Sequence, residues 1–250
     1  MTYTVETHKI HEKLLGLIKI FDEICVKNNI WYTLTSGSVL GAIRHKGFIP
    51  WDRDMDVFVR VDDINKLRKA LVQALPKEMV LHIWDSKSDY HMCFDRLSYA
   101  ETSHDLVHLD IFPLIGAPNN VFSRKIFTNV CFFTYKFFRC KHVDIMYSKE
   151  STVRIVKLLK CFAKLFPDRL IQAWYHFLER LYPLQNAKYV YTIASGYGFK
   201  ECLPKELVLS TKRVEFENIE LPVPLKYHEY LTAVYGDYMT PKREGYKKIF

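Results

Sequence analysis

The chain has little that would indicate a zinc ribbon, a redox motif or a membrane span. Its six cysteines are scattered and form no C-x-x-C pair, which argues against zinc-ribbon and thioredoxin-type motifs. The best apolar stretch, residues 126–135, lies between two lysines and falls far short of the roughly 20 residues that a membrane helix needs. No internal repeat and no low-complexity linker is visible. These absences favour a compact globular protein.

The N-terminal sequence also lacks the apolar run of a secretory signal. MTYTVETHKIHEKLLGL carries acidic and polar residues where such a run would stand. Together with the scattered cysteines, this predicts reduced thiols and a cytoplasmic location.

The composition is that of an ordinary globular protein with a basic excess. The 250 residues are 49% hydrophobic and 26% charged, which allows a sizeable core. A formal net charge of +8 favours anionic partners: nucleotides, phosphorylated glycans, nucleic acid or an anionic membrane surface. The charge alone does not choose among these partners.

Apolar periodicity predicts an α+β fold. Helical spacing covers residues 8–27. Shorter helices are expected at 39–44, from a cap at Asp62 or Asp63 to residue 75, and at 227–235. Strands are expected at 31–35, 54–61, 79–84, 91–99 and 107–112. We therefore expect a catalytic core at 1–118, built as one mixed β-sheet with helices. A helical and irregular half at 119–250 would pack on it as one compact unit.

Three aspartates at alternate positions are the most informative feature. Asp54 and Asp56 lead into an apolar alternation, so in a strand they share one face while Met55 and Val57 face a core. Neighbouring carboxylates repel unless a positive charge lies between them. A hard cation such as Mg²⁺ or Mn²⁺ fits an all-oxygen site of this kind. The simpler reading is a solvent-facing strand edge or a set of helix caps.

The segment before these aspartates is suited to an anionic group. Gly37 and Ser38 are expected to form a small-residue turn after a strand, and Arg44 follows in a cationic run. An arginine fork matches phosphate oxygens bidentately. The alternative for the cationic run is a solvated loop.

A third carboxylate comes from a separate strand. Asp110 stands at the opposite parity to its apolar neighbours Leu109 and Ile111, and a buried carboxylate needs a partner. If its strand lies beside the one that holds Asp54 and Asp56, the three carboxylates form one metal site. Asp110 could then also accept a hydroxyl proton.

Several other features allow more than one reading. The basic, aromatic segment 123–141 is read first as a core helix with a solvated face, second as an interfacial membrane helix and third as an RNA-binding surface. Arg96 either reaches phosphate or forms a salt bridge at a strand edge. The C-terminal tyrosines either form a cage for a quaternary ammonium group or pack in the core.

GSVLGAIRHKGFIPWDRDMDV resembles the signature of the LicD family, and four further blocks resemble family blocks in the same order. These are LDIFPLIGAP, YGFKECLP, VEFENIELPVP and YHEYLTAVYGDYMTPK. The resemblance covers about Ile10 to Pro241. Arg53 and Ile115 stand where family members often have acidic residues.

The resemblance implies a nucleotidyltransferase-type fold and the transfer of an alcohol phosphate. It places the family's metal-binding aspartates at Asp52, Asp54 and Asp56, its distal catalytic aspartate at Asp110, and its donor-binding block at Gly37, Ser38 and Arg44.

The function that we expect is metal-dependent transfer of phosphocholine from CDP-choline to a hydroxyl of a cell-surface glycan. The glycan would belong to lipopolysaccharide, teichoic acid or capsule, and CMP would be released. The alternatives are ribitol, glycerol or ethanolamine phosphate from its CDP donor, nucleotidyl transfer from an NTP, or a basic adaptor that binds glycan or nucleic acid. A lipid-linked acceptor implies peripheral contact with the inner face of the membrane, and no nucleic-acid partner is expected.

Overall fold

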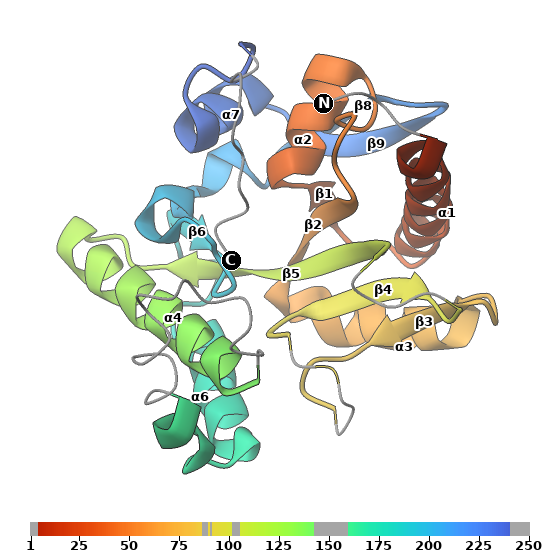
Figure 1. Ribbon diagram of the computed structural model, residues 1–250. Helices are drawn as coiled ribbons and strands as arrows, with labels where there is room; N and C mark the ends of the chain where they lie inside the picture. Colours follow the sequence, from red (N-terminus) through yellow and green to blue (C-terminus); the bar gives the residue numbers. More distant parts are fainter. Residues whose placement is uncertain (1–4, 87–89, 91, 102–105, 143–159, 241–250) are drawn as a thin grey trace.

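The computed structural model describes residues 5–86, 90, 92–101, 106–142 and 160–240 (Figure 1). The helices are α1 (Val5–Lys27), α2 (Ser36–His45), α3 (Ile64–Ala74), α4 (Val121–His142), α6 (Asp168–Arg180) and α7 (Tyr227–Tyr235). The first strands are β1 (Tyr32–Leu34), β2 (Asp54–Arg60), β3 (Met79–His82), β4 (Asp95–Tyr99) and β5 (His108–Ala117). Four more follow: β6 (Tyr189–Tyr191), β7 (Leu203–Pro204), β8 (Thr211–Phe216) and β9 (Ile219–Pro224).

A mixed sheet organises the structure. Its main strand order is β1-β2-β5-β4-β3, and β6 joins the far end of β5 and pairs in turn with β7. The β2–β5 pair is parallel, whereas the other neighbouring pairs are antiparallel. The α+β class and the mixed sheet predicted from the sequence are confirmed.

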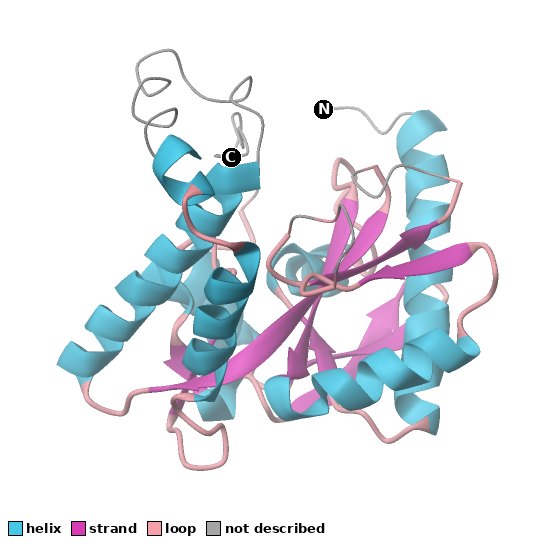
Figure 2. Ribbon diagram, turned by 90° about the horizontal axis from the view of Figure 1, so that it is seen from below, coloured by secondary structure: helices cyan, strands magenta, loops and turns pink. Residues whose placement is uncertain are grey.

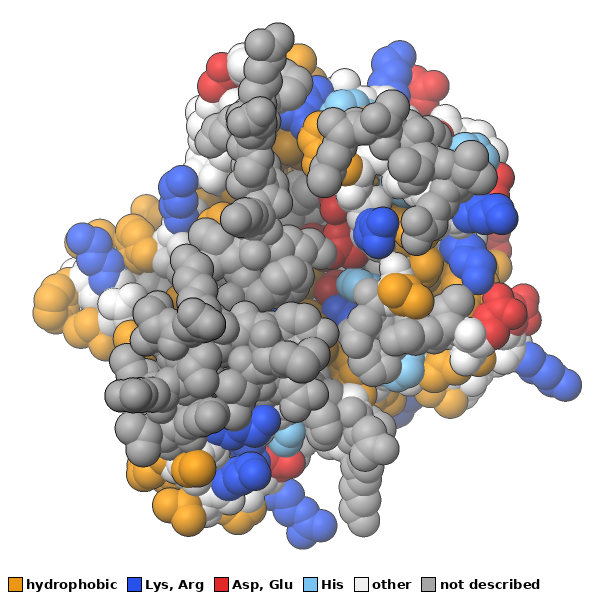
Figure 3. Space-filling model, viewed as in Figure 1, with side chains coloured by type: hydrophobic (Ala, Val, Ile, Leu, Met, Phe, Trp, Pro, Cys, Tyr) orange, Lys and Arg blue, Asp and Glu red, His pale blue; other side chains and the backbone are white. Residues whose placement is uncertain are grey.

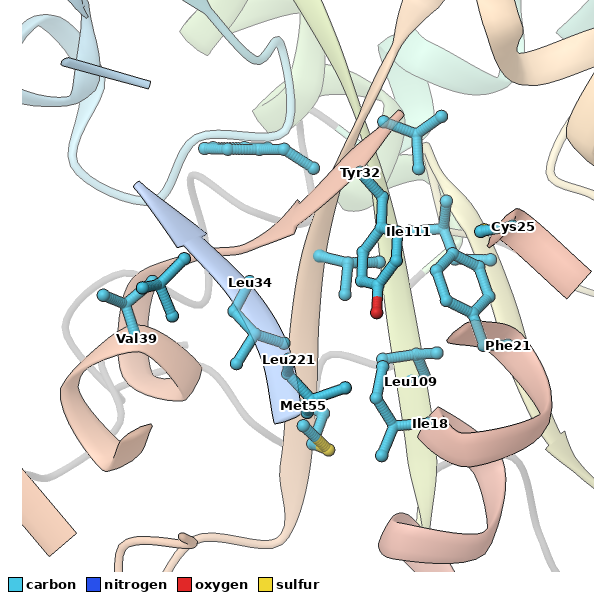
Figure 4. Close-up of a cluster of buried hydrophobic side chains, with 14 of the residues drawn as sticks. Ile18, Phe21, Cys25, Tyr32, Leu34, Val39, Met55, Leu109, Ile111 and Leu221 are labelled. Atoms are coloured by element: carbon cyan, nitrogen blue, oxygen red, sulfur yellow. The ribbon is translucent and has the colours of Figure 1, made fainter. Parts of the chain in front are cut away.

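Strand β5 connects two hydrophobic clusters. Its first part sends Leu109 and Ile111 into the larger cluster, where they meet Phe21 and Cys25 of α1 (Figure 4). Its end sends Ile115 into a second cluster with α4, α6 and β6. Each of these side chains is at most 1% exposed, and fully burying one contributes about 1.5–3 kcal/mol.

A two-stranded hairpin, β8–β9, stands where the sequence pattern indicated irregular structure. Its strands are joined by a two-residue loop in which Glu217 has a φ of 53°. Phe216, Leu221 and Val223 alternate into the larger cluster. This alternation was the local signal for the hairpin, and the aromatic and proline content of the segment obscured it.

Helices α4 and α6 lie side by side at the far end of β5, apart from α1 and α3 (Figures 1 and 2). They bury a second cluster in which Trp84 packs on Tyr175 with ring centroids 4.7 Å apart. Leu184, Val190 and residues of the hairpin belong to the larger cluster. The division predicted at residue 118 stays a prediction. Within the part of the chain that the structure describes, no helix is both long and apolar enough to cross a membrane.

An ionic network ties α6 to the sheet region. Arg68 donates to both oxygens of Asp95 at 2.6 and 2.9 Å and also contacts Asp85. His176 of α6 bonds to Asp85 at 3.0 Å and to Glu179 at 2.8 Å. These two carboxylates raise the pKa of His176 from 6.5 to about 9.

We expect the replacement His176→Gln to destabilise the protein in a pH-dependent way. A pKa that is higher in the folded state stabilises the fold fully below pH 6.5, and this contribution disappears as the pH rises through about 9. The loss should be at most about 3 kcal/mol near pH 6 and fade above pH 9. Chemical denaturation across this pH range measures it. The control His8→Gln, at a pair whose side chains are 56% and 66% exposed, should change little. A loss that does not vary with pH would contradict the assignment.

Candidate active site

Strand β2 presents two aspartates on one face, as its sequence predicts. Met55 and Val57 are buried in the larger hydrophobic cluster, whereas Asp54 and Asp56 line a pocket on the opposite face. The pocket measures about 580 Å³. Acidic side chains gather in a hollow near the middle of the face seen in Figure 3.

The parallel register brings the third predicted carboxylate beside this pair. Asp56 lies directly opposite Asp110 of β5, and Asp110 lies opposite Arg96 of β4. Arg96 donates from Nε to Asp110 Oδ1 at 2.6 Å and from Nη2 to Oδ2 at 3.1 Å. Both side chains are buried, so the ion pair lies inside the sheet. Of the two readings of Arg96, the structure shows the salt bridge, on a central strand of the sheet.

His108 is a further group at this position that sequence reasoning missed. Its Nε2 lies 3.9 Å from Asp54 Oδ2 and 3.8 Å from Asp110 Oδ2. The register pairs His108 with Asp54 across β2 and β5. The histidine therefore lies between the pocket carboxylate and the buried ion pair.

Gly37 and Ser38 lie in the first turn of α2, not in a separate turn before it. The prediction of a turn at these residues was wrong, because the chain reverses earlier: Ser36 has a φ of 49°. Tyr230 fixes this reversal, since its hydroxyl lies 2.8 Å from Thr35 Oγ1 and accepts the Ser36 N–H at 3.0 Å. The N-terminus of α2 therefore faces the pocket, where Ser36 and Gly37 line it.

Close approach explains two small residues of α2. A Cβ on Gly41 would lie 2.5 Å from the carbonyl oxygen of Gly47, and one on Gly37 would lie 3.1 Å from Asp52 Oδ2. Ser38 uses its hydroxyl to accept the Asp56 N–H at 2.9 Å. These contacts fix α2 against the strand and the loop that hold the aspartates.

The loop before β2 is held from the N-terminal helix. The Nε2 atom of His11, on α1, lies 2.8 Å from the carbonyl oxygen of Asp52. The His11 ring stacks on Phe48 with ring centroids 4.4 Å apart. Burial lowers the pKa of His11, which favours its neutral ring. The side chain of Asp52 lines the pocket.

Arg44 lines the pocket from the last turn of α2. Its Nη1 donates to the carbonyl oxygen of Tyr238 at 2.8 Å, and its Nε donates to His45 Nε2 at 3.0 Å. Burial and the neighbouring Arg44 lower the pKa of His45. The cationic fork is thus held in place beside the pocket carboxylates.

The opposite wall of the pocket comes from the C-terminal part of the chain, in which sequence reasoning named no individual site residue. Ser195 donates to the buried carboxylate of Glu201 and accepts the Gly198 N–H at 2.8 Å. Burial raises the pKa of Glu201. It also raises the pKa of Tyr235, and the negative charges of Asp56 and Glu201 add to this shift. The local signal was the compact S-G-Y-G-F-K-E motif.

The structure brings most of the predicted site residues together. Of these, Gly37, Arg44, Asp52, Asp54 and Asp56 line the pocket. Ser38 and Asp110 do not line it but contact or neighbour Asp56: Ser38 accepts the Asp56 N–H, and Asp110 lies opposite Asp56 on the next strand. The assignment of catalytic, donor-binding and metal-binding roles stays a prediction.

The donor set suits a hard divalent cation that is completed by substrate. Asp52, Asp54 and Asp56 offer carboxylate oxygens to one pocket. Within the described residues no three His, Cys, Asp or Glu side chains are arranged so that they alone could hold a metal ion. Mg²⁺ is commonly held by one or two carboxylates together with phosphate oxygens and water, so the residues present fit that mode.

Comparison with known proteins adds the family. The profile of the LicD/FKTN/FKRP nucleotidyltransferase domain matches residues 29–143, the range that contains all the predicted site residues. The lipopolysaccharide cholinephosphotransferase LicD of Haemophilus influenzae is 29% identical over 245 residues, which span 93% of this chain and 91% of that protein. Residues 29–143 thus form a LicD-type nucleotidyltransferase domain. The predicted family resemblance is thereby confirmed.

Two further relatives match only a part of this chain. The human ribitol 5-phosphate transferase FKRP is 34% identical over 85 residues, or 33% of this chain and 16% of that protein. An uncharacterised protein of Rickettsia typhi is 40% identical over 73 residues, or 28% of this chain and 24% of its own length. The LicD likeness therefore extends along nearly the whole chain, whereas the FKRP likeness is local.

Breaking the buried ion pair should be costly. Arg96→Met leaves the Asp110 charge buried without its bidentate partner, which we expect to lower the free energy of unfolding by about 3–5 kcal/mol. Chemical denaturation measures the change. Lys13→Met, at an exposed pair with an N–O distance of 3.1 Å, should cost at most about 1 kcal/mol. The double replacement Arg96→Met with Asp110→Asn should recover part of the loss, and equal costs for Arg96→Met and Lys13→Met would refute this view.

Gly41→Ala tests the close approach of α2 to the loop. The added methyl group would lie 2.5 Å from a backbone oxygen, so backbone atoms must move, and we expect a loss of about 1–3 kcal/mol. Gly196→Ala is the matched control, because no atom lies within 4 Å of its added Cβ. Thermal or chemical unfolding of the two variants compares them. Similar stability in both would show that the approach is not restrictive.

Proposed function

We propose that this protein transfers phosphocholine from CDP-choline to a hydroxyl group of a cell-surface glycan and depends on Mg²⁺ or Mn²⁺. The observation that carries the proposal is the pocket in which Asp52, Asp54 and Asp56 face the start of α2 and Arg44. Support for the choline group comes from the relative in H. influenzae, named as a lipopolysaccharide cholinephosphotransferase.

The charged groups of the pocket would have different roles in binding the donor. A divalent cation, when bound by Asp54 and Asp56, would offset negative charge on the phosphate oxygens. Arg44 would hold the pyrophosphate through its fork, and the N–H groups at the start of α2 would add partial positive charge. Asp110, fixed by Arg96, would keep the parallel strands and the Asp56 carboxylate in register.

The transfer itself is a displacement at phosphorus. A glycan hydroxyl oxygen forms a bond to the phosphorus atom that bears choline, the bond from that phosphorus to CMP breaks, and CMP leaves. The hydroxyl proton passes to a carboxylate that lines the pocket, for which we propose Asp54 or Asp56. Asp110, the other predicted proton acceptor, is bound by Arg96 and does not line the pocket. Catalysis of this kind depends on positioning and charge compensation.

The acceptor that we propose is a lipid-linked glycan precursor of lipopolysaccharide, teichoic acid or capsule. Transfer to such an acceptor would take place in the cytoplasm at the inner face of the membrane. Transfer of ribitol phosphate from CDP-ribitol is the second candidate, because the ribitol 5-phosphate transferase FKRP is similar to a third of this chain.

The test is incubation with labelled donors and an acceptor glycan. CDP-choline with Mg²⁺ should yield CMP and a choline-bearing glycan, and chelation of the metal should stop the reaction. CDP-ribitol, CDP-glycerol, CDP-ethanolamine and CTP serve as competing donors. Release of pyrophosphate from CTP in place of CMP from CDP-choline would establish nucleotidyl transfer and overturn the proposal.

Asp54→Ala should lower the transfer rate at least about a hundredfold, because the pocket loses a carboxylate that faces the reacting phosphate. The side chain of Asp54 is 24% exposed, so the fold should persist, as circular dichroism can verify. Asp62→Ala, at an exposed aspartate just beyond β2, is the matched control and should retain full activity. Full activity of Asp54→Ala would refute the assignment of the site.

A further inference from the structure

An exposed apolar stripe runs along α6. Ile171, Tyr175 and Leu178 face the second cluster and are buried. A second stripe at helical spacing faces outward, and its members are 40–61% exposed: Leu170, Trp174, Phe177 and Leu181. The helix is therefore apolar on two sides, and packing within the described residues accounts for only one of them.

The stripe continues across a groove onto α4. The groove measures about 640 Å³ and is lined mainly by apolar side chains, including Phe133, Phe137, Phe166 and Trp174. Trp174 joins the two helices through a hydrogen bond from its Nε1 to Thr134 Oγ1 at 3.1 Å. We call the surface formed by these residues and the α6 stripe the α4–α6 face.

The helical segments that carry this face are rich in basic residues. Residues 121–142 and 160–181 contain nine Lys and Arg against two Asp and Glu, while the whole chain has 36 against 28. Both acidic residues are already paired: Asp168 with Lys141 at 2.5 Å, and Glu179 with His176. These two segments thus hold nearly all of the chain's positive excess.

We propose that the α4–α6 face docks on an anionic lipid bilayer. Aromatic side chains flanked by Lys and Arg are the composition of a surface that lies in the membrane interface, and Trp is favoured at that depth. Each Lys or Arg near an anionic leaflet adds about 1 kcal/mol of attraction. A second copy of this chain is disfavoured, because a symmetric interface would place two strongly basic surfaces together.

The proposal goes beyond the transfer reaction, since binding to a bilayer can be measured without donor or acceptor. Flotation of the full-length protein with vesicles is the experiment. It should bind vesicles of phosphatidylcholine and phosphatidylglycerol in equal parts, bind pure phosphatidylcholine far less, and be released by high salt. Equal binding to both vesicle types, or binding to neither, would overturn the proposal.

Variants of the face separate its apolar and charged contributions. Phe133→Ser with Leu170→Ser should weaken vesicle binding at least about tenfold. The matched control Val72→Ser with Leu225→Ser changes side chains that are 68% and 51% exposed elsewhere, and it should bind as the unchanged protein does. Unchanged binding of the face variant, or an equal loss in both, would refute the assignment of this surface.

Charge reversal has its own control. Lys164→Glu with Arg169→Glu should weaken binding about tenfold or more, whereas Lys69→Glu with Lys77→Glu, the same change of charge at exposed positions on α3 and after it, should weaken it far less. Equal effects would show that net charge, not this face, governs binding.

Trp174 reports directly on insertion. Lipids with brominated chains should quench tryptophan fluorescence in the bound protein, and Trp174→Phe should remove most of this quenching while binding persists. Trp51→Phe, at an exposed tryptophan of the pocket, should leave the quenching in place. Quenching that survives Trp174→Phe would overturn the proposal. So would a dimer, seen by light scattering, that the face variants dissociate while vesicle binding is unchanged.

Discussion

The structure depends on the parallel pairing of β2 with β5. This register places Asp56 beside Asp110. The residues on either side of them in the two strands point to the other face of the sheet and lie in the core. A carboxylate so deeply buried needs a fixed positive partner, because removing one partner of a buried ion pair costs about 3–5 kcal/mol. Arg96, from the next strand, provides that partner with two hydrogen bonds. The ion pair therefore lets an otherwise apolar strand carry a carboxylate next to Asp56.

The other parts of the site are arranged around this strand pair. Ser38 accepts the backbone N–H of Asp56, and Tyr230 fixes the reversal that starts α2. His11 reaches the loop from the N-terminal helix. Segments from the two ends of the chain thus position a helix N-terminus, an arginine and three carboxylates around one cavity. Such an arrangement favours an anionic substrate whose charge is shared among several fixed groups.

Local pattern was enough to predict the face of Asp54 and Asp56, because strand parity depends only on neighbouring residues. It also gave Tyr227–Tyr235 as a helix with the bounds that the structure shows. It did not give Glu201, since no periodicity distinguishes a pocket carboxylate in a single 3₁₀ turn from one in solvent. The start of α2 was missed for a related reason: its reversal depends on Tyr230, 194 residues further along the chain.

The same reasoning explains why the basic, aromatic segment kept three readings until its geometry was visible. Sequence alone shows apolar and basic residues interleaved along α4, which favours a core helix first and an interfacial helix second. The structure separates the readings by burial: Phe127 and Phe138 enter the second cluster, whereas Phe133 is 68% exposed beside the groove. A core role thus accounts for one side of the helix. The other side carries exposed apolar area, which is unfavourable in water, and positive charges, which an anionic surface attracts. We therefore assign this side to the bilayer.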